Sequence, residues 1–294
     1  MNYRIGTRNS RLAMVQANML EDAIRASGME AEIVSMTTTG DRILDKSLAQ
    51  IGGKGLFMKE LDEALFQGKT DLSLHCVKDM MPEVPIDYPI LGVSKREDVR
   101  DVLVLPKGQT ELLPEKPVGC SSIRRRLQFH KLYPGVPVSD VRGNVLTRLE
   151  KLDRGEYSAL ILAAAGLKRL GLEERISRYF STEEMLPAAG QGVLAVQGRA
   201  DLDPAGLSGF FDEDAFYAVK AERAYIRELN GGCTSPVCAY ATLEKEKLYL
   251  RALYVKASES YDEETPYIIR SAEGNKTDAE AIGQNLAREM KGLL

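Results

Sequence analysis

The sequence predicts a three-domain α/β protein, in which two similar lobes are followed by a smaller α/β domain with an antiparallel sheet. Strand-like and helix-like segments alternate over the first two thirds of the chain, which favours mixed or parallel sheets covered by helices. The pattern restarts near residue 118. The length of 294 residues fits two or three domains of ~100–200 residues each.

The first part of the chain alternates strands and helices. Residues 3–6 and 30–37 are typical of strands, and apolar residues at helical spacing predict a helix over 11–27 between them. A second helix is expected over 59–67 and a short strand over 72–75. This order is typical of a sheet with helices on its faces.

The middle part follows breaks that are rich in proline, at 82–89 and 106–117. Two apolar runs, 90–94 and 102–105, flank a charged stretch. In the restarted pattern we expect a strand ending at 118–119, a helix over 123–132, a strand over 138–141, a helix over 146–153 and a buried strand over 159–164. In the last part we expect a long helix over 212–229, strands over 248–255 and 267–271, and an amphipathic helix over 277–294.

Composition and charge argue against several classes of protein. Lys and Arg number 39 against 43 Asp and Glu, and the net charge of -4 disfavours a nucleic-acid partner. The N-terminus lacks the apolar core of a signal peptide, and no apolar stretch is long enough to span a membrane. Four scattered cysteines without a CxxC pair, and only two histidines, argue against a metal site. We therefore expect a cytoplasmic protein with free thiols and no membrane partner.

Two segments repeat one pattern. Residues 6–11 and 119–124 each place a glycine and small polar residues between a strand and a basic helix start. Each is typical of a capped helix whose free N–H groups face outward, and two such halves facing each other would form a cleft suited to anions. Two ordinary capped helices without a shared cleft are the alternative.

Arginine is concentrated near helix starts in the middle of the chain. The run 121–126 ends in three arginines, and Arg142 and Arg148 follow. Because the helix dipole disfavours cations at a helix start, this placement points to an anionic ligand. Arginine binds carboxylates and phosphates through bidentate bonds, and the acidic net charge favours a small polyacid over DNA. For any single arginine, a solvated surface charge is the alternative.

Three other segments could carry chemistry. His75 to Asp79 close a strand with acid–base and charged groups, at the edge where α/β sheets bind ligands, although a strand-end ion pair is the alternative. Residues 52–55 are rich in glycine, but no Ser or Thr follows Lys54, so we expect a turn or a loop that delivers Lys54 and Phe57 to a ligand rather than a P-loop. Cys233 follows two glycines, which suits an accessible thiol, although most lone cysteines are buried.

Taken together, these motifs resemble the porphobilinogen deaminase family over nearly the whole chain. Any single motif is weak, but their order and spacing are specific. The matching stretches are residues 7–10, 39–41, 52–57, 77–79, 121–125, 142–145, 165–170, 186–187, 190–192, 221–223 and 231–233.

The resemblance implies three domains, of which the first two resemble the lobes of type-2 periplasmic binding proteins. The implied boundaries are 1–94 with about 193–208 for the first lobe, 100–186 for the second lobe and 213–294 for the C-terminal domain. The resemblance also implies that Cys233 holds a dipyrromethane cofactor through a thioether and that Asp79 is the catalytic carboxylate. Positions at the cofactor and substrate are implied for Arg8, Ser10, Gln16, Lys54, Phe57, Lys78, Ser121, Ser122, Arg124, Arg125, Arg142, Arg148, Arg169 and Gln191.

The implied reaction condenses four porphobilinogen molecules head to tail, with loss of ammonia, and releases a linear tetrapyrrole by hydrolysis, in porphyrin and haem biosynthesis. A monomer is expected. The acetate and propionate groups of porphobilinogen would account for the arginines. A two-lobed anion-binding module without catalysis is the alternative, but it gives no reason for Cys233. The chain departs from the family at Cys76, Cys120, Gln50 and Met81, where many relatives have Ser, Thr, Lys and Pro.

Overall fold

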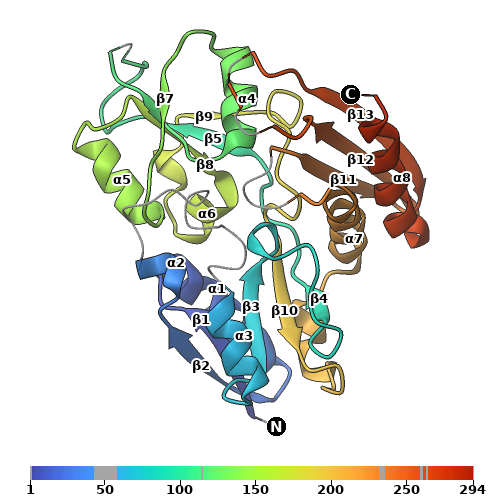
Figure 1. Cartoon of the computed structure of the whole chain (residues 1–294). Helices are drawn as coiled ribbons and strands as arrows, with labels where there is room; N and C mark the ends of the chain where they lie inside the picture. The colour runs from blue at the N-terminus through green and yellow to red at the C-terminus, as the bar shows by residue number, and fades with distance from the viewer. Residues whose placement is uncertain are drawn as a thin grey trace.

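The computed structural model describes residues 2–42, 58–113, 115–231, 236–258, 261–262 and 264–293. Over these residues the chain forms two five-stranded sheets and one three-stranded sheet. Figure 1 shows the two larger sheets in the lower and upper parts of the molecule, with the third sheet and helices α7 (Glu213–Glu228) and α8 (Ala279–Lys291) at their side. Three sheets in this arrangement confirm the predicted three-domain α/β fold.

The first sheet belongs to the first lobe. Its elements are β1 (Asn2–Arg8), α1 (Arg11–Ala26), β2 (Glu30–Met36), α2 (Thr39–Arg42), α3 (Lys59–Phe66), β3 (Leu72–Cys76), β4 (Ile90–Val93) and β10 (Leu194–Gly198). The strand order is β2-β1-β3-β10-β4. Strand β1 pairs in parallel with β2 and β3, whereas β10 runs antiparallel to β3 and β4. The apolar face of α1, with Leu20 and Ile24, packs on this sheet in a core that includes Ile5.

The second sheet repeats the topology of the first. Its elements are β5 (Asp101–Val104), β6 (Val118–Gly119), α4 (Ile123–Leu132), β7 (Val138–Ser139), α5 (Val145–Asp153), β8 (Ala159–Ala163), α6 (Ala164–Arg169) and β9 (Arg178–Tyr179). The order is β7-β6-β8-β5-β9, with β6 parallel to β7 and β8, and β5 antiparallel to β8 and β9. The two lobes are thus structural equivalents, as the repeated sequence pattern predicted.

The second sheet is built from one continuous stretch of chain, whereas the first sheet takes its strand β10 from beyond the second. Strand β5 follows β4 directly but lies in the second sheet, and β10 follows β9 but returns to the first. The chain therefore crosses between the lobes twice, through residues 94–100 and 180–193. The two crossings lie side by side, because the amide of Ser94 donates to Leu194 O at 2.8 Å and that of Glu97 donates to Gly192 O at 3.1 Å.

The third sheet is antiparallel, as predicted, and is formed by β11 (Cys238–Glu244), β12 (Lys247–Tyr254) and β13 (Ile268–Asn275). Helices α7 and α8 cover it, and Tyr225, Leu250 and Met290 are fully buried between the layers. No helix among the described residues is long and apolar enough to cross a membrane.

The C-terminal domain reaches both crossings through one buried carboxylate of α7. Glu222 is fully buried and accepts hydrogen bonds from Arg96 Nη2 at 2.7 Å, Gly190 N at 2.6 Å and Ala241 N at 2.8 Å. Burial raises the pKa of Glu222, while the charge of Arg96 opposes this rise. One side chain therefore joins the third domain to the two segments that connect the lobes.

Several element boundaries differ from the sequence predictions. The last helix begins at Ala279 and ends at Lys291, because Lys276–Asp278 form a 3-10 turn in which Asn275 accepts a bond from the amide of Thr277. Strand β13 extends to Asn275 rather than ending at 271, and β7 covers two residues of the predicted four. Strands β10 and β11 have no counterpart among the predicted strands.

Candidate active site

A cleft of about 730 Å³ lies between the two lobes, with the C-terminal domain at its side. Every predicted site residue that the structure describes lines this cleft. These residues are Arg8, Ser10, Gln16, Lys78, Asp79, Ser121, Ser122, Arg124, Arg125, Arg142, Arg148, Arg169 and Gln191. Lys54, Phe57 and Cys233 lie outside the described residues, as does Gln50. Of the two cysteines that replace common hydroxyls, Cys76 lines the cleft, whereas Cys120 is buried and does not.

Three helices direct their first turns into the cleft. Each is capped by a side-chain oxygen: Ser10 Oγ accepts from Ala13 N at 3.3 Å in α1, Ser122 Oγ from Arg125 N at 3.4 Å in α4, and Asn144 Oδ1 from Thr147 N at 3.0 Å in α5. None of the three first turns contains an acidic residue. The positive helix ends therefore face the cleft without a side-chain counter-charge, which favours an anionic ligand.

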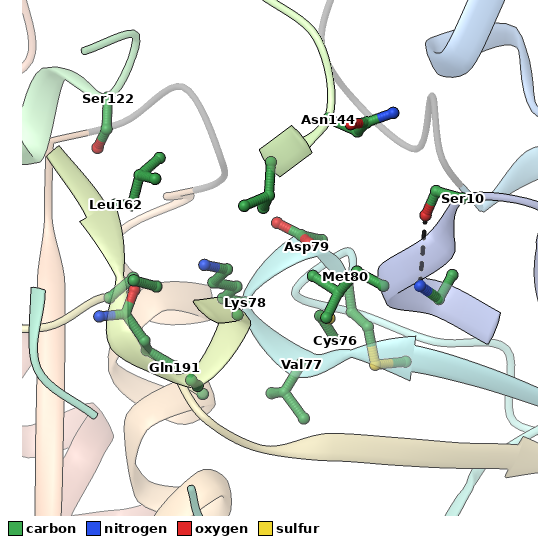
Figure 2. Close-up of a pocket in the computed structure, with 18 of the residues that line it drawn as sticks. Ser10, Cys76, Val77, Lys78, Asp79, Met80, Ser122, Asn144, Leu162 and Gln191 are labelled. Atoms are coloured by element: carbon green, nitrogen blue, oxygen red, sulfur yellow. Dashed lines mark hydrogen bonds between the residues drawn. The ribbon is translucent and has the colours of Figure 1, made fainter. Parts of the chain in front are cut away.

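Asp79 lines the cleft from a 3-10 turn (Val77–Asp79) that directly follows β3. Figure 2 shows its carboxylate between Ser10 of the first lobe and Leu162 and Ser122 of the second. The turn is held by backbone bonds from Val77 N to Val193 O and from Met80 N to Val77 O, both 3.1 Å long.

Two glycines allow the second crossing to pass close to this turn. Gly190 and Gly192 have φ of 71° and 85°, which L-residues rarely adopt. A Cβ at Gly190 would lie 2.2 Å from Cγ1 of Val77, and one at Gly192 would lie 2.4 Å from the carbonyl oxygen of Glu97. The motif of residues 190–192 thus packs the second crossing against both the turn that carries Asp79 and the first crossing.

A buried charge cluster forms the back wall of the cleft. Asp101 is fully buried and accepts bonds from Arg124 Nη1 at 2.6 Å, Arg125 Nε at 2.9 Å and Gln191 Nε2 at 2.9 Å. Burial alone would raise the pKa of Asp101, but the charges of Arg124 and Arg125 outweigh it and hold the pKa below its ordinary value. Two buried cations thus share one carboxylate, which leaves net positive charge beside the cleft.

The remaining cations add to this excess. Burial lowers the pKa of Lys78, and the neighbouring charge of Asp79 opposes the decrease. Burial also lowers the pKa of Arg148, with a further contribution from Arg125. Arg148 Nε donates to Gly143 O at 2.7 Å and Arg169 Nη2 to Gly192 O at 2.6 Å, but neither arginine forms an ion pair with a residue that the structure describes.

The sequence analysis missed several residues of the site, among them Asp101 and Arg223. Asp101 belongs to a charged stretch that gave no sign of its two arginine partners. Arg223 also lines the cleft, and it belongs to the matching stretch 221–223 without a role assigned to it. In the described part of the chain, no group of three or more His, Cys, Asp or Glu is placed to hold a metal ion.

The fold and the site define a two-lobed α/β protein whose central cleft suits a small ligand with several carboxylates. Residues 3–205 match the family model described as porphobilinogen deaminase, dipyromethane cofactor binding domain, and residues 216–292 match that of the porphobilinogen deaminase C-terminal domain. The chain belongs to the porphobilinogen deaminase family, whose members are transferases.

Relatives named porphobilinogen deaminase align along nearly their whole length. The protein of Acetivibrio thermocellus is 52% identical over 292 residues, covering 99% of this chain and 98% of its own. That of Alkaliphilus oremlandii is 51% identical over 294 residues, covering 99% and 97%. Among solved structures, the methionine binding protein MetQ is similar at 13% identity with a TM-score of 0.46, covering 83% of this chain and 99% of its own.

Proposed function

We propose that this chain joins four porphobilinogen molecules head to tail on a covalent dipyrromethane primer and then releases hydroxymethylbilane by hydrolysis. The charge of the cleft carries the proposal. Asp79 supplies the one carboxylate among the described lining residues, against nine cations. These cations are Arg8, Arg11, Lys78, Arg124, Arg125, Arg142, Arg148, Arg169 and Arg223.

The cations other than Arg223, together with the helix starts, would hold the acetate and propionate groups of the pyrroles. Arg148 and Arg169 lack carboxylate partners among the described residues, so their guanidinium groups suit this role best. Further positions at cofactor and substrate are proposed for Arg8, Ser10, Gln16, Lys54, Phe57, Lys78, Ser121, Ser122, Arg124, Arg125, Arg142 and Gln191. Arg124 and Arg125 would act while paired with Asp101, each as part of a cluster with net positive charge.

The residues of the cleft fit a dipyrromethane with its four carboxylates. Arg169 Nε is buried without a hydrogen-bond partner in the described part of the chain, and three helix starts face the same space. We propose that Cys233 holds this group through a thioether, and that the group supplies the free α-carbon to which the first substrate is added.

Asp79 would act on the pyrrole nitrogens and on the charge that develops during the reaction. Loss of ammonia from the aminomethyl group of porphobilinogen leaves a cation delocalised over its pyrrole ring. Attack on its methylene carbon by the free α-carbon of another pyrrole forms a carbon–carbon bond, and the attacking ring then loses the proton from that α-carbon. A fixed carboxylate can accept hydrogen bonds from the pyrrole N–H groups. It can also stabilise the transient cation without any reorganisation of the site. The position of Asp79 in the cleft, as the one carboxylate among the described lining residues, supports this role.

The domain boundaries expected from the sequence remain our proposal: 1–94 with about 193–208, 100–186 and 213–294. We also propose a monomer in the cytoplasm, with porphobilinogen as its small-molecule partner. The acidic net charge of -4 supports the absence of a nucleic-acid partner.

Intact-mass measurement tests the proposal directly. The wild-type protein should carry an adduct with the mass of two linked pyrroles, and Cys233→Ser should carry none and be inactive. Asp79→Asn should keep the adduct but lose about 100–1000-fold in single-turnover rate, because it removes a preorganised charge. An adduct-free wild-type protein that binds polycarboxylates without turnover would instead support the non-catalytic anion-binding module.

A further inference from the structure

The turn that carries Asp79 is tied to the C-terminal domain by an arginine of α7. Arg223 Nη2 donates to the carbonyl oxygens of Met81 at 2.8 Å and of Pro82 at 2.9 Å. These two carbonyls belong to the segment that leaves Asp79. One guanidinium group therefore bridges two consecutive peptide units, two and three residues beyond the carboxylate.

The same helix holds the turn by apolar contact. Met80 is buried in a cluster that includes Ala215 and Val219 of α7 and Val77 of the turn. Met80 and Arg223 thus fix the chain on the C-terminal side of Asp79 to a helix of a different domain.

Arg223 is a cation that has no carboxylate partner among the described residues. Burial lowers its pKa to about 10, with a smaller contribution from Arg227, so the group stays charged at neutral pH. Taking a charged group out of water is costly unless its hydrogen bonds are worth more than its hydration. Placing such a cation on two carbonyls, rather than on an acid, suggests that the position of those carbonyls matters.

Of the two residues whose carbonyls Arg223 holds, Pro82 has a φ fixed by its ring, but Met81 does not. A proline at position 81 would fix the φ of that residue. The backbone before it would accept a proline, because Met80 is extended, with φ of -76° and ψ of 152°. Methionine supplies no such stiffness. The two bonds from Arg223 restrain the same stretch of backbone from outside.

We propose that Arg223 is a positioning residue, which fixes the Asp79 carboxylate relative to the carboxylate-binding groups of the cleft. This inference rests on the proposed catalytic role of Asp79. Arg223 would act only through Asp79, so its effect on the rate should depend on the presence of that carboxylate.

A double-mutant cycle separates this role from a general structural one. The single-turnover rate would be measured for cofactor-loaded wild type, Arg223→Met, Asp79→Asn and the double mutant, with the loaded fraction counted by intact mass. A displacement of about 1 Å at a reacting group can cost about 100-fold, so Arg223→Met should lose about 10–100-fold in rate with little change in KM. The double mutant should be no slower than Asp79→Asn within about twofold, because sites that act as a unit are not additive.

Two further variants make the outcome decisive. Arg227→Met removes a cation one turn along the same helix, which pairs with Glu280, and should leave the rate unchanged. Arg223→Lys keeps the charge and can reach one of the carbonyls, so it should recover at least half of the lost rate, on a logarithmic scale. If Arg223→Met does not fold, the cycle is measured with Arg223→Lys.

The failures of the two proposals differ. Near-normal turnover of Asp79→Asn would refute the role of Asp79, and this inference with it. If Asp79→Asn is strongly slowed as expected, but loss of Arg223 lowers its rate by a further 10-fold or more, the positioning role alone would be refuted. The positioning role would also be refuted if the rates of the Arg223 variants fell only in proportion to their cofactor-loaded fraction or their thermal stability.

Discussion

Replacing Asp101 by asparagine tests whether the back wall of the cleft is a charge cluster that a polyanionic ligand completes. The change keeps the size of the side chain and one acceptor oxygen but removes the charge between Arg124 and Arg125. Both arginines are nearly fully buried, with 5% and 8% of their surface exposed, so water cannot replace the lost carboxylate.

The expected loss is large. Removing one partner of a buried ion pair typically costs about 3–5 kcal/mol, because the other charge is left buried and unpaired. Asparagine can still accept one of the bonds that reach Asp101 from Arg124, Arg125 and Gln191. We therefore expect the free energy of unfolding to fall by about 3 kcal/mol, the lower end of that range.

Urea denaturation of loaded and unloaded protein measures this loss. The unloaded form is obtained with Cys233→Ser. The Asp101→Asn loss should be smaller in the loaded protein, because on the proposed function the carboxylates of the bound group would lie near the same cations and stabilise the folded state. Asp140→Asn is the matched control: its carboxylate pairs with Arg126 at the surface, where such pairs contribute about 0–1 kcal/mol. An Asp101→Asn loss below about 0.5 kcal/mol, typical of surface substitutions, would refute the reasoning, and equal losses in both forms would show that the cluster does not face the ligand.

Three further predictions follow from individual contacts. Arg148→Leu should fold normally but lose tenfold or more in cofactor loading or turnover, since a charge-assisted bond is worth about 1.5–3 kcal/mol; unfolded protein would contradict this. Burial lowers the pKa of His75 to about 4. Between pH 6.5 and pH 4 the unfolded chain therefore binds a proton at this residue that the folded chain excludes. The free energy of unfolding should fall by about 3 kcal/mol over this range because of His75. His75→Gln should lack this part of the acid sensitivity in denaturation curves at pH 4.5 and 7.5, and an unchanged pH dependence would count against it. Glu222→Gln should lower the free energy of unfolding by about 3 kcal/mol, because Arg96 loses its buried partner. A double-mutant cycle with Arg96→Gln should show strong coupling, and additive losses would show that the two side chains do not stabilise the fold as a pair.

The sequence predicted those parts of the fold that depend on local signals. Helix α4 begins and ends where it was expected, because Ser122 caps it and apolar residues recur at helical spacing. Strands β10 and β11 could not be found in this way. Leu194–Gly198 ends in a glutamine and a glycine, and its neighbours in the sheet lie about 100 residues earlier in the chain. Its strand conformation depends on those neighbours more than on its own residues.

The same distinction between local and distant signals applies to the residues of the site. Asp79 and the arginines were predicted because motifs and helix starts mark them locally. The partners of these residues were not predictable, because tertiary folding alone brings them together. Asp101 and Arg125 are 24 positions apart in the chain, and Arg223 and Met81 are 142 positions apart. In neither pair does the sequence around one residue indicate its partner.

The return of β10 to the first sheet has a consequence for the order in which the protein can be completed during synthesis. The second sheet has all its strands once Tyr179 has left the ribosome, whereas the first sheet, begun at Asn2, waits for β10 and Gly198. Until then β4 has no partner in its sheet, since only β10 joins it to the rest. The lobe that starts first is therefore finished last, and a nascent chain or truncation product that stops before residue 194 presents unpaired edges on β3 and β4, which are sites for aggregation or chaperone binding.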